Sequence, residues 1–102
     1  MKNSEKKLDK IKGLISIARK AGFAIVGGEN LLSYDKKLYL VLLDASAGKS
    51  LLREVDFFCK SKGLVPVFVK KLNEYTGIEN CKVLGIKNKK LAENIEELLK
   101  GE

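Results

Sequence analysis

The motif with the clearest chemical content is Gly48-Lys49-Ser50, which follows the apolar run Leu38–Leu43 and precedes a helical pattern. Between a strand and a helix, Gly-Lys-Ser is the second half of a P-loop, in which backbone N–H groups and the lysine hold phosphates. The complete motif needs a glycine five residues before Gly48, and that position is Leu43. A nucleotide-binding module is therefore an alternative. The simpler interpretation is an ordinary turn in which Asp44 or Ser46 caps the helix.

A second candidate is the run Val26-Gly27-Gly28-Glu29-Asn30 at another strand-to-helix junction. Two glycines permit positive φ and close approach of a ligand to the backbone. They leave the first N–H groups of the following helix available to a phosphate or a base edge. The Asn30 amide matches the paired donor and acceptor edges of purines. A glycine turn with Asn30 serving the helix start explains the same residues equally well.

Residues for enzymatic chemistry are scarce. The chain has no histidine, so the usual general base near neutral pH and any Ser–His or Cys–His pair are missing. Cys59 and Cys81 are far apart and fall at apolar positions, so we interpret both as buried hydrophobic residues. We expect neither catalysis nor a metal ion or other cofactor.

The charge balance points to a polyanionic partner. Lys and Arg number 20 against 13 Asp and Glu, which gives a net charge of +7 and a pI near 9.4. Nucleic acid is the commonest polyanion that a small basic domain meets. A lysine-rich surface that only serves solubility is the alternative. No apolar stretch is long enough to cross a bilayer and the first ten residues lack a signal-type segment, so we expect a cytoplasmic protein without a membrane partner.

Alternating helical and strand patterns must position these candidates. The apolar spacing predicts helices over about 5–20, after Ser4 as N-cap, and over 29–35, 49–62, 72–75 and 89–99, the last capped by Asn88. It predicts strands over 24–26, 38–43, 64–69 and 81–86. The continuous apolar run Leu38–Leu43 is typical of a strand covered on both faces. Pro66 favours an edge position or a bulge for its strand. We predict an α/β fold, a three-layer α/β/α sandwich with a mixed sheet of about four strands, in one domain over residues 1–102.

Four segments in this order resemble one family. They are KIKGLISIARKAG (10–22), AGFAIVGGENLLS (21–33), LVLLDAS (40–46) and KGLVPVFV (62–69). Together they resemble the kink-turn RNA-binding ribosomal proteins of the L-seven-Ae and thirty-e superfamily, and within it the small bacterial YlxQ-like members. The resemblance implies a sandwich that grips sharply bent RNA at one end of its sheet, without catalysis. Ribosomal RNA and the ribosome are then the expected partners, whereas the sequence does not indicate an oligomeric state.

The resemblance also implies contact residues. Matching the family pattern places the helix start that enters the RNA on Gly28, Glu29 and Asn30, directly after Gly27. A second contact surface falls on Lys70, Lys71 and Leu72, where Leu72 and the nearby Tyr75 either meet splayed bases or belong to the core.

The chain departs from the family pattern at two positions. Tyr34 stands where a lysine is expected and Leu31 where a glutamate is expected. Lys36 and Lys37 are the candidates to replace the missing charge. The same departures favour another alternative, a protein–protein adaptor that keeps the fold without binding RNA.

Overall fold

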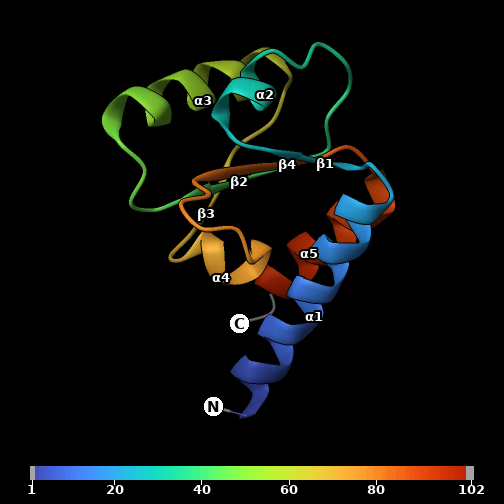
Figure 1. Cartoon of the computed structure of the whole chain (residues 1–102). Helices are drawn as coiled ribbons and strands as arrows, with labels where there is room; N and C mark the ends of the chain where they lie inside the picture. The colour runs from blue at the N-terminus through green and yellow to red at the C-terminus, as the bar shows by residue number, and fades with distance from the viewer. Residues whose placement is uncertain (1, 101–102) are drawn as a thin grey trace.

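The computed structural model describes the backbone of residues 2–100 and the side chains of residues 6–100, and it forms three layers (Figure 1). A four-stranded sheet lies between α2 and α3 on one face and α1, α4 and α5 on the other. The elements in chain order are α1 (Lys2–Lys20), β1 (Ala24–Val26), α2 (Gly28–Leu32), β2 (Leu40–Asp44), α3 (Lys49–Ser61), β3 (Val67–Val69), α4 (Leu72–Thr76), β4 (Val83–Ile86) and α5 (Lys89–Lys100).

The sheet is mixed, with the strand order β1-β4-β2-β3. Strand β4 pairs antiparallel with both β1 and β2, whereas β2 pairs parallel with β3 across the α3 crossover. Strands β1, β2 and β3 therefore all end where β4 begins, at one end of the sheet. This architecture confirms the predicted α/β/α fold class.

The central strand β2 is buried on both faces, as its continuous apolar run predicts. Leu40 and Leu42 pack towards α1, α4 and α5, while Val41 and Leu43 pack towards α2 and α3. The period of two along the strand thus divides its side chains between two cores. Gly85 on β4 makes room for Leu31, since a Cβ at Gly85 would lie 2.7 Å from Leu31 Cδ1.

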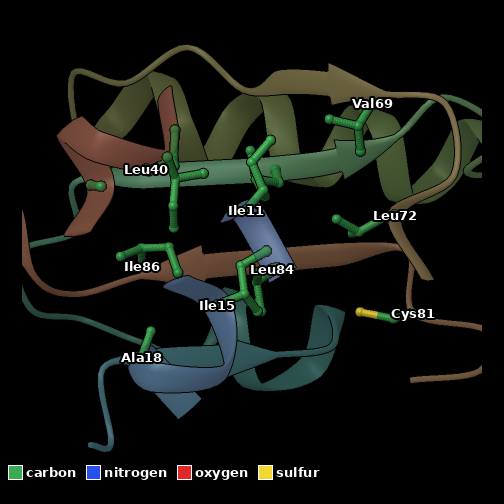
Figure 2. Packing of buried hydrophobic residues seen from close by; sticks show 12 residues of the cluster. Ile11, Ile15, Ala18, Leu40, Val69, Leu72, Cys81, Leu84 and Ile86 are labelled. Atoms are coloured by element: carbon green, nitrogen blue, oxygen red, sulfur yellow. The ribbon is translucent and has the colours of Figure 1, made fainter. Parts of the chain in front are cut away.

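The larger core lies under α1, α4 and α5 (Figure 2). Ile11 and Ile15 of α1 have exposed fractions of 0% and 1% and pack against Leu84 and Ile86 of β4. The amphipathic spacing of α1 predicts this contact. Figure 2 shows Leu72, at the start of α4, beside Val69 at one end of the same cluster.

Several element boundaries differ from the predictions. Helix α2 ends at Leu32 rather than near residue 35, and β3 covers 67–69 rather than 64–69. Pro66 has no N–H group for a ladder, so pairing starts after it, and β3 is an edge strand as Pro66 predicts. Both cysteines are buried, which confirms their interpretation as hydrophobic residues, and burial raises the pKa of the Cys59 thiol to about 11.

Within residues 2–100, no helix combines the length and the apolar character needed to cross a membrane.

Candidate nucleic-acid interface

The sheet topology brings the two predicted contact segments to the same end of the molecule. Across this end, the Gly27 N–H donates to the Val83 carbonyl (3.2 Å), the Asp44 N–H to the Lys82 carbonyl (2.7 Å) and the Ala45 N–H to the Val69 carbonyl (2.8 Å). We call this region the glycine end, and it comprises residues 27–30, 44–46, 69–71 and 82. Three strand spacings, about 14 Å, separate β1 from β3. One ligand of nucleic-acid size can therefore touch both segments.

The two glycines at this end are required for different structural reasons. Gly27 has φ 92° and ψ 152°, a conformation that side-chain-bearing residues rarely adopt. Gly28 has an ordinary φ, but a Cβ there would lie 3.0 Å from Leu51 Cδ1 on α3. Gly27 therefore allows the sharp turn from β1 into α2, and Gly28 allows α2 to start close against α3.

Asn30 is exposed and its amide is only partly engaged. Its Nδ2 donates to the Val26 carbonyl at 2.9 Å, which leaves a second amide hydrogen and the Oδ1 oxygen for a ligand. The first helical hydrogen bond of α2 runs from the Leu31 N–H to the Gly27 carbonyl (3.1 Å), so the N–H groups of residues 28–30 precede the helical ladder. Glu29 is exposed beside them.

Asp44 holds the middle of the glycine end together. It is 3% exposed, and its carboxylate accepts hydrogen bonds from the Ser46 N–H (2.8 Å), the Ser46 hydroxyl (2.8 Å) and the Leu72 N–H (3.2 Å). Burial would raise the pKa of Asp44, but these bonds and the Lys82 charge outweigh it and hold the pKa below its ordinary value. Asp44 therefore joins the end of β2 to the start of α4.

This arrangement corrects the expectation that Asp44 or Ser46 caps the helix that follows them. The N-cap residue of α3 is Gly48, which has no side chain to accept a hydrogen bond. Asp44 instead accepts from Leu72, the first residue of α4, which is 28 positions away in the chain.

Lys82 belongs to the glycine end but was not among the predicted contacts. Its Nζ donates to the Ser46 hydroxyl at 2.9 Å, which in turn donates to Asp44. Lys70 and Lys71 are exposed one strand further along. Lys82 could only have been found by knowing that β4 pairs with β2, because no local pattern marks it.

The turn before Gly48-Lys49-Ser50 does not favour a bound nucleotide phosphate. In a P-loop the backbone N–H groups of the turn point to the phosphate. Here the Ser46 N–H already donates to a buried carboxylate, and that negative charge would repel a phosphate. Leu43, in place of the first glycine, is 0% exposed and paired in the sheet.

Leu72 corrects another expectation. Its side chain is 0% exposed and packs in the larger core, so it cannot contact RNA bases in this conformation. Its role is to anchor α4, through the N–H bond to Asp44 and through its core contacts. Tyr75 is partly buried against the same core.

Lys36 and Lys37 lie at the opposite end of the sheet. They precede β2, whose five residues span roughly 16 Å before the chain reaches the glycine end. The Lys36 carbonyl accepts from Lys62 Nζ (2.7 Å) at the end of α3. The structure therefore does not bring these two lysines together with Gly27–Asn30 and Lys70–Lys71.

Leu31 and Tyr34, the two residues that depart from the family pattern, both contribute to packing. Leu31 is 0% exposed in the smaller core, and Tyr34 is partly buried and packs against that core. Among the described residues, no group of three or more His, Cys, Asp or Glu side chains could hold a metal ion.

Two solved structures share this fold. A protein of unknown function from Bacillus halodurans matches with a TM-score of 0.76 and 21% sequence identity, over 88% of this chain and 96% of that chain. A 15.5kD RNA binding protein from Giardia lamblia matches with a TM-score of 0.62 and 18% identity, over 96% of this chain and 91% of that chain. At these identities the likeness shows the fold alone. No protein-family model matches the sequence, and no curated protein does.

Proposed function

We propose that the chain acts as one RNA-binding domain that binds a structured, sharply bent RNA at the glycine end, without catalysing a reaction. The RNA is ribosomal or belongs to a ribosome-associated particle. The observation that carries the proposal is the strand arrangement that gathers Gly27–Asn30, Lys82 and Lys70–Lys71 at one end. A protein of the same fold is described as RNA binding, which supports the same class of ligand.

The side chains at this end divide into two kinds of contact. Lys70, Lys71 and Lys82 are placed to meet phosphates, and such contacts weaken steeply as the salt concentration rises. Asn30 and the N–H groups at the start of α2 are placed to meet base edges. Glu29 would repel a phosphate, but its carboxylate can accept a hydrogen bond from an exocyclic amine of a base.

A bent RNA suits this arrangement better than a regular duplex. The deep, narrow major groove of an A-form helix keeps its base edges from side chains, whereas a sharp bend splays bases outward. The Gly27–Asn30 segment lies about 14 Å from Lys70–Lys71 across the sheet, with Lys82 between them. A bend exposes unpaired bases and a backbone turn within such a distance.

A gel-shift titration tests the proposal with a kink-turn RNA and an unbent duplex of equal length. We expect binding of the kink-turn RNA to be at least about tenfold tighter. Asn30→Ala is expected to reduce that preference, because it removes the amide facing the bases. Equal affinity for the two RNAs would leave only non-specific attraction by charge and would contradict the proposal.

The double variant Lys70→Ala/Lys71→Ala tests the phosphate contacts. We expect the slope of log affinity against log salt concentration to fall in magnitude by about two, one unit for each lost contact. The matched control is Lys10→Ala/Lys12→Ala, which removes the same charge from exposed positions of α1. If the control weakens binding as much as the test variant, net charge rather than the glycine end governs affinity.

A protein–protein adaptor is the second candidate, favoured by exposed apolar residues near the edge strand β3. Val65 and Phe68 have exposed fractions of 82% and 58%, and Phe57 of α3 has 75%. Failure of the kink-turn titration, together with binding of a protein partner that Phe68→Ser abolishes, would support the adaptor.

A further inference from the structure

The end of the sheet opposite the glycine end holds a second group of basic side chains. Strands β1 and β2 start here, β4 ends here, and α3 ends beside them. We call it the lysine–tyrosine end, and it comprises Tyr34, Lys36, Lys37, Tyr39, Lys62 and Lys87. None of its contacts contributes to the proposed site at the glycine end.

Three of the four lysines at this end have their ammonium groups over tyrosine rings. Lys62 Nζ and Lys87 Nζ lie 5.8 Å and 5.3 Å from the centroid of the Tyr34 ring. Lys62 Nζ also donates to the Lys36 carbonyl at 2.7 Å, and Lys37 Nζ lies 5.4 Å from the centroid of the Tyr39 ring. These cation–π contacts restrict the flexible lysine side chains before any ligand binds.

Among the described side chains, no ion pair joins an acidic residue to this group. Among the side chains of residues 6–100, the ion pairs join Lys60 to Asp56 and Lys100 to Glu96, and none involves Lys36, Lys37, Lys62 or Lys87. Asp35 is an exposed acidic residue between Tyr34 and Lys36, whereas Lys89 and Lys90 add two further positive charges after Asn88. Positive charges held together without a carboxylate partner favour a polyanion as their ligand.

The position of this end relative to the glycine end indicates the form of that polyanion. The two ends are separated by roughly the 16 Å length of β2. An A-form RNA duplex advances about 2.8 Å per base pair, so a flank of about six base pairs covers this length. A helical arm that leaves the bend at the glycine end can thus reach the second group of lysines.

We propose that the lysine–tyrosine end is a second RNA-contact surface, which binds the phosphate backbone of a duplex arm of the same RNA. This proposal rests on the proposed function of the glycine end. Lys62 and Lys87 contact phosphates, and both of their ammonium groups contact the Tyr34 ring in the free protein. The chain then contacts both the bend and one of its arms.

Two kink-turn RNAs with the same bend test this surface, one with a duplex arm of two base pairs and one with an arm of eight. We expect the wild-type protein to bind the long-arm RNA about tenfold more tightly. The variant Lys62→Ala/Lys87→Ala is expected to lose this gain and to keep its preference for bent over unbent RNA on the short-arm substrate. The charge-retaining variant Lys62→Arg/Lys87→Arg and the control Lys10→Ala/Lys12→Ala are expected to keep the gain.

The outcomes separate the two surfaces. A long-arm gain that the Lys62→Ala/Lys87→Ala variant retains would overturn the second surface, as would equal affinity of the wild type for both arm lengths. Displacement of the long arm by poly-glutamate at the same charge concentration would overturn the assignment to RNA. If the wild type shows no preference for bent RNA but the arm-length gain depends on Lys62 and Lys87, the glycine end is refuted and the phosphate surface stands.

Discussion

Replacing Asp44 by asparagine tests how the glycine end is built. The asparagine keeps the shape of the side chain but has one amide group in place of a carboxylate oxygen. Asp44 accepts three hydrogen bonds, from two groups of Ser46 and from the Leu72 N–H. In the variant at least one of these donors faces another donor.

The magnitude follows from the surroundings of each donor. Ser46 is exposed, so water replaces its lost bonds, whereas the Leu72 N–H lies in a buried bond. An unsatisfied buried donor costs about 1–3 kcal/mol. We therefore expect Asp44→Asn to lower the free energy of unfolding by about 1–3 kcal/mol, which moves the midpoint of urea unfolding by roughly 1 M.

The pH dependence identifies the charge of Asp44 as the cause. The pKa of Asp44 in the folded protein is below its ordinary value, which is about 3.9. The ionised form therefore stabilises the fold above about pH 4, and this contribution is lost as the pH falls towards the folded pKa. The stability difference between wild type and Asp44→Asn should be full at pH 7 and should shrink below about pH 4.

Urea unfolding followed by circular dichroism at several pH values between 7 and 3 measures this difference. Asp9→Asn is the matched control, because Asp9 is exposed on α1 and its replacement should change stability by less than about 0.5 kcal/mol. A difference for Asp44→Asn that is equally small, or that stays constant from pH 7 to pH 3, would refute the role given to the buried carboxylate.

Three further predictions concern single residues. Gly27→Ala should destabilise the fold by about 1–3 kcal/mol in urea unfolding, because the alanine must adopt φ 92°. Gly48→Ala, at φ −66° with open space around it, should change stability by less than about 1 kcal/mol, because the entropic gain of alanine and its weaker N-cap preference oppose each other. Leu72→Ala should cost about 2–5 kcal/mol in thermal or urea unfolding, and a fully folded variant with weakened RNA binding would contradict its assignment to the core. The Cys59 thiol, with a pKa of about 11, should react with a disulfide reagent at pH 8 only on unfolding, so rapid labelling of the native protein would contradict its burial.

Local sequence patterns predict much of the fold. The apolar run Leu38–Leu43 predicts a strand covered on both faces, and Pro66 predicts an edge strand. The glycine pair predicts a strand-to-helix junction, and Gly27 has the positive φ that such a junction permits. These features depend on residues that are neighbours in the chain, so the sequence carries them directly.

The composition of each end of the sheet depends on strand order, which local patterns do not carry. Because β4 lies between β1 and β2, those two strands run in the same direction. Lys36 and Lys37, which precede β2, therefore lie at the opposite end from Gly27, which follows β1. The same pairing places Lys82 beside Asp44.

Local sequence patterns also do not predict which groups donate hydrogen bonds to Asp44. A carboxylate after a strand and before a helix ordinarily suggests a cap for that helix. Here β3 pairs parallel with β2, so the start of α4 returns to the end of β2 and supplies the Leu72 N–H. The residue type is the same in both cases, and only the tertiary fold decides which helix it serves.

The most direct test of the central claim is a map of the amide chemical-shift changes of the protein during titration with a kink-turn RNA. Binding at the glycine end predicts the largest changes at residues 27–30, 45–46, 70–71 and 82, with the exposed face of α5 unaffected. Changes confined to α5 or to the Phe57 side of α3, with residues 27–30 and 70–71 unmoved, would contradict it.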